Sequence, residues 1–151
     1  MYQHWDANAI VVIATALAVG AVVLVHYEGL NLLSRWLAQR HMSHRRRKVL
    51  FGIFGVLGLH ALEVWIFGAT AWGLLHLPNT GSVDGVHALD LLDAVYLSVT
   101  TYTTLGVGDF APVGPIRFLE GTVALTGFVL IAWSASFTYL EMSRDWSETS
   151  R

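Results

Sequence analysis

The stretch Thr100-Thr101-Tyr102-Thr103-Thr104-Leu105-Gly106-Val107-Gly108-Asp109 decides how the rest of the chain is interpreted. It is rich in hydroxyl groups, ends in Gly-x-Gly-Asp, and lies between two long apolar segments. Inside a membrane, non-helical backbone is tolerated only where protein buries it or where it lines a watery cavity. The stretch therefore indicates backbone oxygens placed to hold a ligand. The simpler interpretation is an ordinary Gly-rich loop that joins two helices.

Composition favours a membrane protein. Of 151 residues, 54% are hydrophobic and 13% are charged, whereas a soluble domain carries about 25% charged residues. The chain has no Cys, which excludes disulfides and thiolate metal sites. The sequence His60-Ala61-Leu62-Glu63 is not the His-Glu-x-x-His motif of metalloproteases. We therefore do not expect an enzyme.

Three segments are long and apolar enough to cross a bilayer, which takes about 20 residues. They predict an extra N-terminal transmembrane helix within residues 1–28, an outer helix at 49–77 and an inner helix at 117–141. The outer segment carries a strip of small residues, Gly52, Gly55 and Gly58, which permits close helix packing. Residues 90–102 are mostly apolar but too short to span, as expected of a re-entrant helix.

Charge predicts the orientation. Residues 29–48 form a connector whose leucines, among them Leu30, Leu33 and Leu37, suggest a short amphipathic segment on the membrane surface. Six of the nine basic residues lie between Arg35 and Lys48, and cytoplasmic loops are enriched in Lys and Arg. The alternative is a patch for nucleic acid or lipid headgroups. The topological interpretation places the N-terminus outside, and the C-terminus with the tail at 143–151 in the cytoplasm.

The segment 49–142 resembles the two-helix pore module of bacterial members of the tetrameric pore-loop potassium channel family. The resemblance rests on Tyr96-Leu97-Ser98-Val99-Thr100-Thr101, on Gly106-Val107-Gly108-Asp109, and on Pro112 and Arg117. It implies an all-α membrane protein with three transmembrane helices, a pore helix at 90–102, a filter at 104–109 and a homotetramer in a bacterial-type plasma membrane. The extra helix carries no Arg or Lys over residues 9–27, so it is not a voltage sensor.

The same resemblance assigns the ion ligands. Thr104 would offer its hydroxyl and carbonyl oxygens to K⁺, and Leu105, Gly106 and Val107 would offer carbonyl oxygens, with Gly108 completing the filter. No other cofactor, small-molecule substrate or nucleic acid is implied. Two positions depart from the family: Val107 stands where Tyr is usual, and Leu105 where Val is usual. Both departures change the side chains that support the loop rather than the backbone carbonyls.

Acidic residues surround the predicted filter. Asp109 and Asp84 would form an outer mouth that concentrates cations, together with Asp90 and Asp93. The alternative for Asp90 and Asp93 is that they cap the pore helix.

Six residues are predicted to support the filter: Tyr96, Thr100, Thr101, Glu63, His60 and Glu120. An intramembrane carboxylate is costly and needs a partner. Glu63 is therefore either a brace for pore-helix hydroxyls such as Thr100 or Thr101, or one half of a proton-linked gate or metal pair with His60. Glu63 or Glu120 could replace the carboxylate that the family often has at the position of Thr100.

Gly127 is a candidate hinge of the inner helix, or else a packing site. The remaining histidines are scattered in the sequence and receive no metal role: His4, His26, His41, His44, His76 and His87.

The predicted function is passive K⁺ conduction through a backbone-carbonyl filter at a four-fold axis. Two alternatives remain open. One is a weakly selective channel for monovalent cations, Na⁺ included, which Val107 would allow. The other is a non-conducting membrane scaffold or accessory subunit of the same fold.

Overall fold

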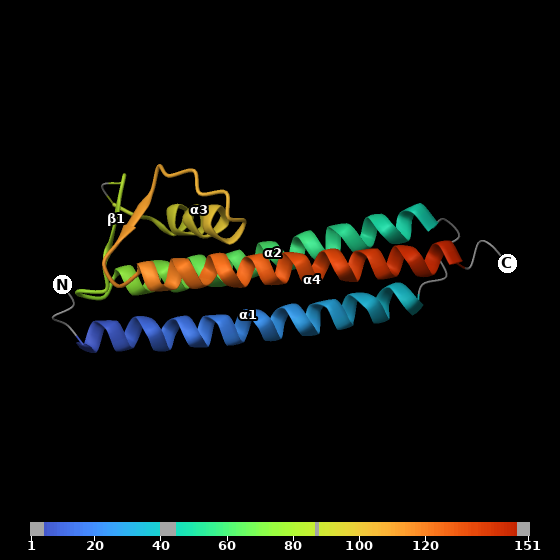
Figure 1. Cartoon of the computed structure of the whole chain (residues 1–151), viewed down its shortest axis with the longest axis horizontal. Helices are drawn as coiled ribbons and strands as arrows, with labels where there is room; N and C mark the ends of the chain where they lie inside the picture. The colour runs from blue at the N-terminus through green and yellow to red at the C-terminus, as the bar shows by residue number, and fades with distance from the viewer. Residues whose placement is uncertain (1–4, 40–44, 87, 148–151) are drawn as a thin grey trace.

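Three long helices lie side by side in the computed structural model, which describes residues 5–39, 45–86 and 88–147. The helices are α1 (Trp5–Gln39), α2 (Arg45–Leu75) and α4 (Arg117–Ser147), and α2 runs in the opposite direction to α1 and α4, as Figure 1 shows. Each contains a stretch long and apolar enough to cross a membrane. The chain is thus an all-α membrane protein in its main architecture.

Helix α1 is longer than expected. It continues unbroken to Gln39, about 52 Å at 1.5 Å per residue, so residues 29–39 do not form a separate surface segment. The leucines of this part pack on α2: Leu33 lies against Gly55, and Leu37 against Gly52. The small residues of α2 leave room for them, which explains why the helix stays with the bundle. Residues 40–44 of the predicted connector lie outside the described residues.

Helix α3 (Leu91–Tyr102) is short and packs mainly against α2, with α4 as its second neighbour. Its N-terminus is closed by a capping box. The backbone N–H of Asp93 donates to Oδ1 of Asp90 over 2.8 Å, and the N–H of Asp90 donates to Oδ2 of Asp93 over 3.2 Å. These bonds satisfy helix-end donors that would otherwise lack partners. The capping role considered for Asp90 and Asp93 is confirmed.

A small antiparallel ribbon joins the segments on either side of α3. Strand β1 (Ser82–Asp84) pairs with β2 (Ala111–Val113), with Val83 opposite Pro112. The ribbon was not expected. It ties the segment before α3 to the segment after it, so that the loop between α3 and β2 is held at both ends.

Helices α2 and α4 also differ from their predicted bounds. Helix α2 begins at Arg45 rather than 49 and ends at Leu75 rather than 77, because the His76–Ser82 segment turns back with Asn79 at a positive φ of 63°. Helix α4 continues to Ser147, into the segment expected to be a tail.

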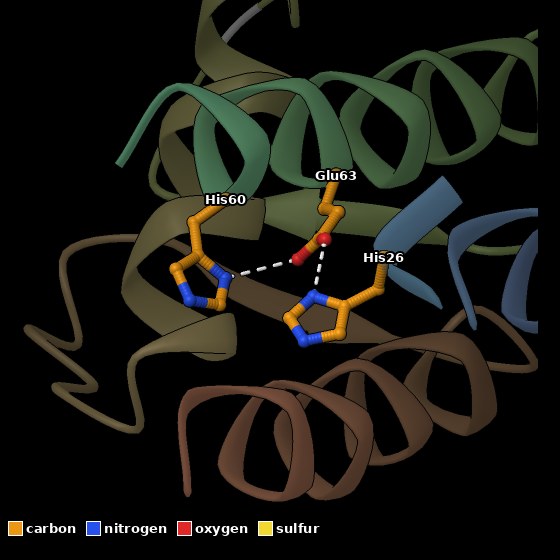
Figure 2. A group of neighbouring side chains, drawn as sticks. All are labelled: His26, His60 and Glu63. Atoms are coloured by element: carbon orange, nitrogen blue, oxygen red, sulfur yellow. Dashed lines mark hydrogen bonds and ion pairs between the residues drawn. The ribbon is translucent and has the colours of Figure 1, made fainter. Parts of the chain in front are cut away.

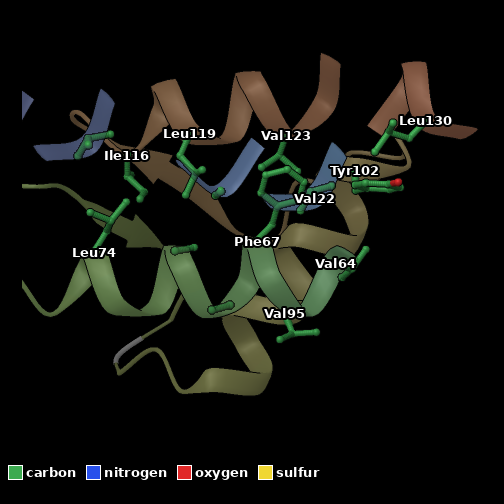
Figure 3. Packing of buried hydrophobic residues seen from close by; sticks show 14 residues of the cluster. Val22, Val64, Phe67, Leu74, Val95, Tyr102, Ile116, Leu119, Val123 and Leu130 are labelled. Carbon is green, nitrogen blue, oxygen red and sulfur yellow. The ribbon is translucent and has the colours of Figure 1, made fainter. Parts of the chain in front are cut away.

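The core lies where α2, α3 and α4 meet, and α1 closes one side (Figure 3). Phe67, Ile116, Leu119 and Val123 are fully buried there. The side chains of α1 that face it recur every three or four residues, as a helix with one buried face requires: Ala7, Val11, Thr15, Ala18, Val22, His26 and Leu30.

Candidate functional site

The loop that follows α3, residues 103–110, has an unusual backbone. Thr104, Gly106 and Gly108 have positive φ values of 58°, 55° and 85°, whereas the intervening Leu105 and Val107 do not. Alternation between left- and right-handed residues turns successive N–H groups to one side of a chain, and hence successive carbonyls to the other. Thr104 holds a conformation that costs a non-glycine residue roughly 1–2 kcal/mol, and such strain clusters at functional sites.

Hydrogen bonds from the end of α3 hold the start of this loop. The N–H of Thr103 donates to Val99 O over 3.0 Å, that of Thr104 to Thr101 O over 2.9 Å, and that of Gly106 to Thr100 O over 3.1 Å. The carbonyls of Thr104 to Val107 are not used in this anchoring. The backbone oxygens predicted to be ion ligands therefore remain available.

The end of the loop that leads into β2 is fastened to α3 by Tyr96. Its hydroxyl donates to Oδ2 of Asp109 over 2.9 Å, and its ring meets that of Phe110 edge to face with centroids 5.6 Å apart. The hydrogen bond to Asp109 raises the pKa of Tyr96, because an ionised phenol could not donate. Support at this end comes from Asp109 and Phe110, while the side chain of Val107 is 55% exposed.

The two residues predicted to form an acidic mouth lie at the same end of the bundle. Asp84 is exposed and stands opposite Ala111 in the ribbon. Ala111 follows Asp109 by two positions in the sequence. Its neighbour Gly85 touches the backbone carbonyl of Asp109, so closely that a Cβ there would collide. The exposed carboxylates of Asp84 and Asp109 thus flank the outer end of the loop.

Gly127 lies where α3 meets α4. A Cβ at this position would collide with the carbonyl oxygen and the ring of Tyr102. Helix α4 passes through this residue without a break. The glycine therefore has a packing role, since it allows the last turn of α3 to approach α4. A hinge at Gly127 stays a prediction.

A buried polar cluster lies below the loop, at the level of the last turn of α3 (Figure 2). Glu63 of α2 is fully buried. Its Oε1 lies 2.7 Å from Nδ1 of His26 on α1, and its Oε2 lies 3.0 Å from Nδ1 of His60. The hydroxyl of Tyr102 donates to the same Oε2 over 2.5 Å and lies 2.8 Å from Nδ1 of His60. One carboxylate thereby connects α1, α2 and α3.

The hydroxyl that Glu63 binds is not the predicted one. Thr100 donates to the carbonyl of Leu97 in its own helix. Among the described residues, the side chains bonded to Glu63 are those of His26, His60 and Tyr102, and not that of Thr101. Tyr102 points toward α2 instead, because successive helical residues face about 100° apart. The brace interpretation of Glu63 thus holds with a different residue, and Thr100 and Thr101 are corrected as its partners.

Glu120 lies apart from Glu63, on α4, and is 5% exposed. Neither of its carboxylate oxygens makes a hydrogen bond of good geometry to the described residues. A buried carboxylate without such a bond is costly. The six predicted support residues therefore do not form one cluster: His60 lies with Glu63, Tyr96 binds Asp109, and Glu120 stands apart.

His26 is the member of this buried cluster that sequence reasoning missed. It stands 37 positions from Glu63 in the sequence. A signal existed, because a histidine on the apolar face of a spanning helix is costly and indicates a partner.

Comparison with known proteins identifies the family. A search of curated proteins and a search of solved structures found no significant match. The family model described as "Ion channel" matches residues 60–142, more than half of the chain. This segment contains α3, the loop, the ribbon strand β2 and most of α4, together with His60 and Glu63. The three apolar helices agree with such a protein, and the chain belongs to the ion channel family.

Proposed function

We propose that four copies of this chain form a channel that conducts K⁺ passively, through an axis lined by backbone carbonyls of Thr104 to Val107. The observation that carries the proposal is the alternation of φ sign along Thr104, Leu105, Gly106, Val107 and Gly108. Alternation of this kind can turn successive carbonyls to one side of a loop, as the proposal requires. In this proposal α3 is the pore helix and the loop is the filter.

Potassium is the ion that suits this ligand set. An ion that enters a narrow filter must exchange its hydration shell for other oxygens, and rings of backbone carbonyls do so in potassium channels. Thr104 adds a hydroxyl at the inner end. Gly106 and Gly108 adopt positive φ without steric cost, so that neighbouring carbonyls follow at short intervals.

The four-fold arrangement follows from the single loop. One loop can offer oxygens to only one side of an ion. Every residue from Thr103 to Asp109 is exposed in the single chain, Leu105 by 69%. A closed ring of four copies would bury these residues and surround the ion, and closed symmetry is the rule for homo-oligomers.

The local electrostatics favour cations. The C-terminal end of α3 adjoins the loop, and a helix C-terminus carries partial negative charge. Asp84 and Asp109 stand exposed at the outer end, and four copies of each would raise the local cation concentration.

Weak selectivity is the second candidate, and the environment of Val107 favours it. In this loop the pore-helix phenol of Tyr96 bonds to Asp109, whereas the side chain of Val107 is aliphatic and cannot form a hydrogen bond of this kind. A filter held less rigidly at this level could also admit Na⁺.

The reversal potential of the purified protein in liposomes tests both candidates. With K⁺ on one side and Na⁺ on the other, a reversal potential near the potassium equilibrium value is expected, and a value near zero would favour weak selectivity.

Gly106→Ala should abolish the current, because its φ of 55° is strained for alanine. Gly20→Ala on α1 is the matched control, since its surroundings are open. Absence of current from wild-type tetramers would overturn the proposal and favour a scaffold.

A further inference from the structure

We propose that His26, His60 and Glu63 form a binding site for a divalent transition metal of the Zn²⁺ class. One ligand atom of each residue, a ring nitrogen from each histidine and a carboxylate oxygen, lies within 4.8 Å of the other two. Figure 2 shows the two imidazoles converging on the carboxylate from α1 and α2. The binding step does not depend on potassium conduction.

The donor set selects the class of metal. Two imidazole nitrogens and one carboxylate match the three protein ligands of many zinc sites. Imidazole also suits Cu, Ni and Fe, whereas Mg²⁺ and Ca²⁺ require oxygen ligands. The site is thus distinct in chemistry from the carbonyl oxygens of the loop.

The geometry needs only a small adjustment. The distances from Glu63 to the two Nδ1 atoms are 2.7 and 3.0 Å, those of hydrogen bonds. Zinc–ligand bonds of about 2.0–2.1 Å in a tetrahedral site place the ligand atoms roughly 3.3 Å apart. Each histidine nitrogen must therefore move about half an ångström from the carboxylate, and the separation of the two nitrogens, at most 4.8 Å, must settle at the same value. The hydroxyl of Tyr102 supplies an oxygen beside the same carboxylate.

The tautomer of His26 supplies an independent argument. When Nδ1–H donates to Glu63, Nε2 becomes a buried acceptor, and it has no hydrogen-bond partner among the described residues. A buried polar atom without a partner is costly. When a metal binds Nδ1 of a neutral imidazole, the ring carries its proton on Nε2. The ring of Trp133 packs against this imidazole with centroids 5.2 Å apart, and an aromatic face can accept an N–H.

The charge of the buried cluster also favours a bound divalent cation. The two ion pairs of the buried Glu63 are with these histidines, which are cationic only when protonated. With neutral histidines the cluster holds a net negative charge away from water. A divalent cation compensates this charge without any protonation, and buried charges are normally paired or bound to metal.

The position of the site would allow a bound metal to influence the 103–110 loop. Tyr102 is the last residue of α3 and directly precedes the 103–110 loop. A metal on Glu63 changes the hydrogen bond that Tyr102 makes. It also fastens α1 to α2, which would make the extra helix a part of the regulation.

Metal binding to the purified tagless protein tests the proposal. The background variant carries alanine in place of the other five histidines, at positions 4, 41, 44, 76 and 87. Co²⁺ titration should show the visible absorption of a tetrahedral site with one ion per chain, and Zn²⁺ should displace it. X-ray absorption of the Zn²⁺ form should show two imidazole ligands.

Three variants and one control complete the test. In the same background, His26→Gln, His60→Gln and Glu63→Gln should each weaken Zn²⁺ binding by at least about 100-fold, the upper end of the effect of losing an outer-shell partner. Glu28→Gln, on an exposed face of α1, should bind as the background does. Absence of a stoichiometric ion, a zinc spectrum without imidazole, or unchanged affinity in the variants would overturn the proposal. The spectroscopy of the background protein decides the matter even if a variant fails to fold.

Discussion

Tyr102 leaves no room for a side chain at Gly127: a Cβ there would collide with the carbonyl oxygen of Tyr102, where α3 ends on α4. Gly127→Ala should therefore push the last turn of α3 away from α4. Overpacking of this kind costs about 1–3 kcal/mol, and the displacement would reach the loop at residue 103. We expect a lower midpoint of thermal unfolding and a smaller current.

The control for this change is Gly20→Ala, at a position where a new Cβ meets nothing within 4 Å. Both substitutions gain the higher helix propensity of alanine, roughly 1 kcal/mol, so their difference isolates the collision. A Gly127→Ala protein as stable as the control would show that the packing role is wrong.

Glu63→Gln should destabilise the chain by about 1–3 kcal/mol, the usual cost of leaving a buried hydrogen-bonding group without its partner. The carboxylate accepts from three groups, whereas an amide presents a donor to one of them: His26, His60 or Tyr102. Thermal unfolding in detergent and current in liposomes measure the effect. Glu28→Gln is the matched control. Unchanged stability together with unchanged current would refute the brace.

The sequence predicts the helices of this fold, but it does not predict the ribbon or the contact between His26 and Glu63. Span lengths and the short apolar segment before Gly106 predict three long helices and one short one. The ribbon has three-residue strands, one of which contains Pro112, and so carries no strand signal. The contact of His26 with Glu63 depends on how α1 rotates against α2, which periodicity alone leaves open.

Tyr96 should ionise above the ordinary phenol pKa of about 10, because its hydroxyl donates to Asp109. Its pKa is raised in the folded chain. The stabilisation from this bond is therefore complete below the unfolded pKa and is lost as pH rises through the folded value. The difference in ultraviolet absorbance between wild type and Tyr96→Phe isolates this titration. Asp109→Asn should lower the pKa of Tyr96, whereas the exposed Tyr139→Phe should leave it unchanged. A Tyr96 that titrates at the ordinary value would contradict the bond.

Orientation in the membrane can be read with single cysteines, because the chain has none of its own. Ser82 in β1 and Asp6 at the start of α1 are exposed at one end of the bundle, and Gln39 is exposed at the other (Figure 1). Arg35, near the end of α1, and residues 45–48, at the start of α2, belong to the Gln39 end, and basic residues favour the cytoplasm. An impermeant maleimide applied to intact cells should thus label Ser82→Cys and Asp6→Cys, and should label Gln39→Cys only after permeabilisation. Labelling of Gln39→Cys alone would reverse the proposed topology, and with it the assignment of Asp84 and Asp109 to the outer mouth.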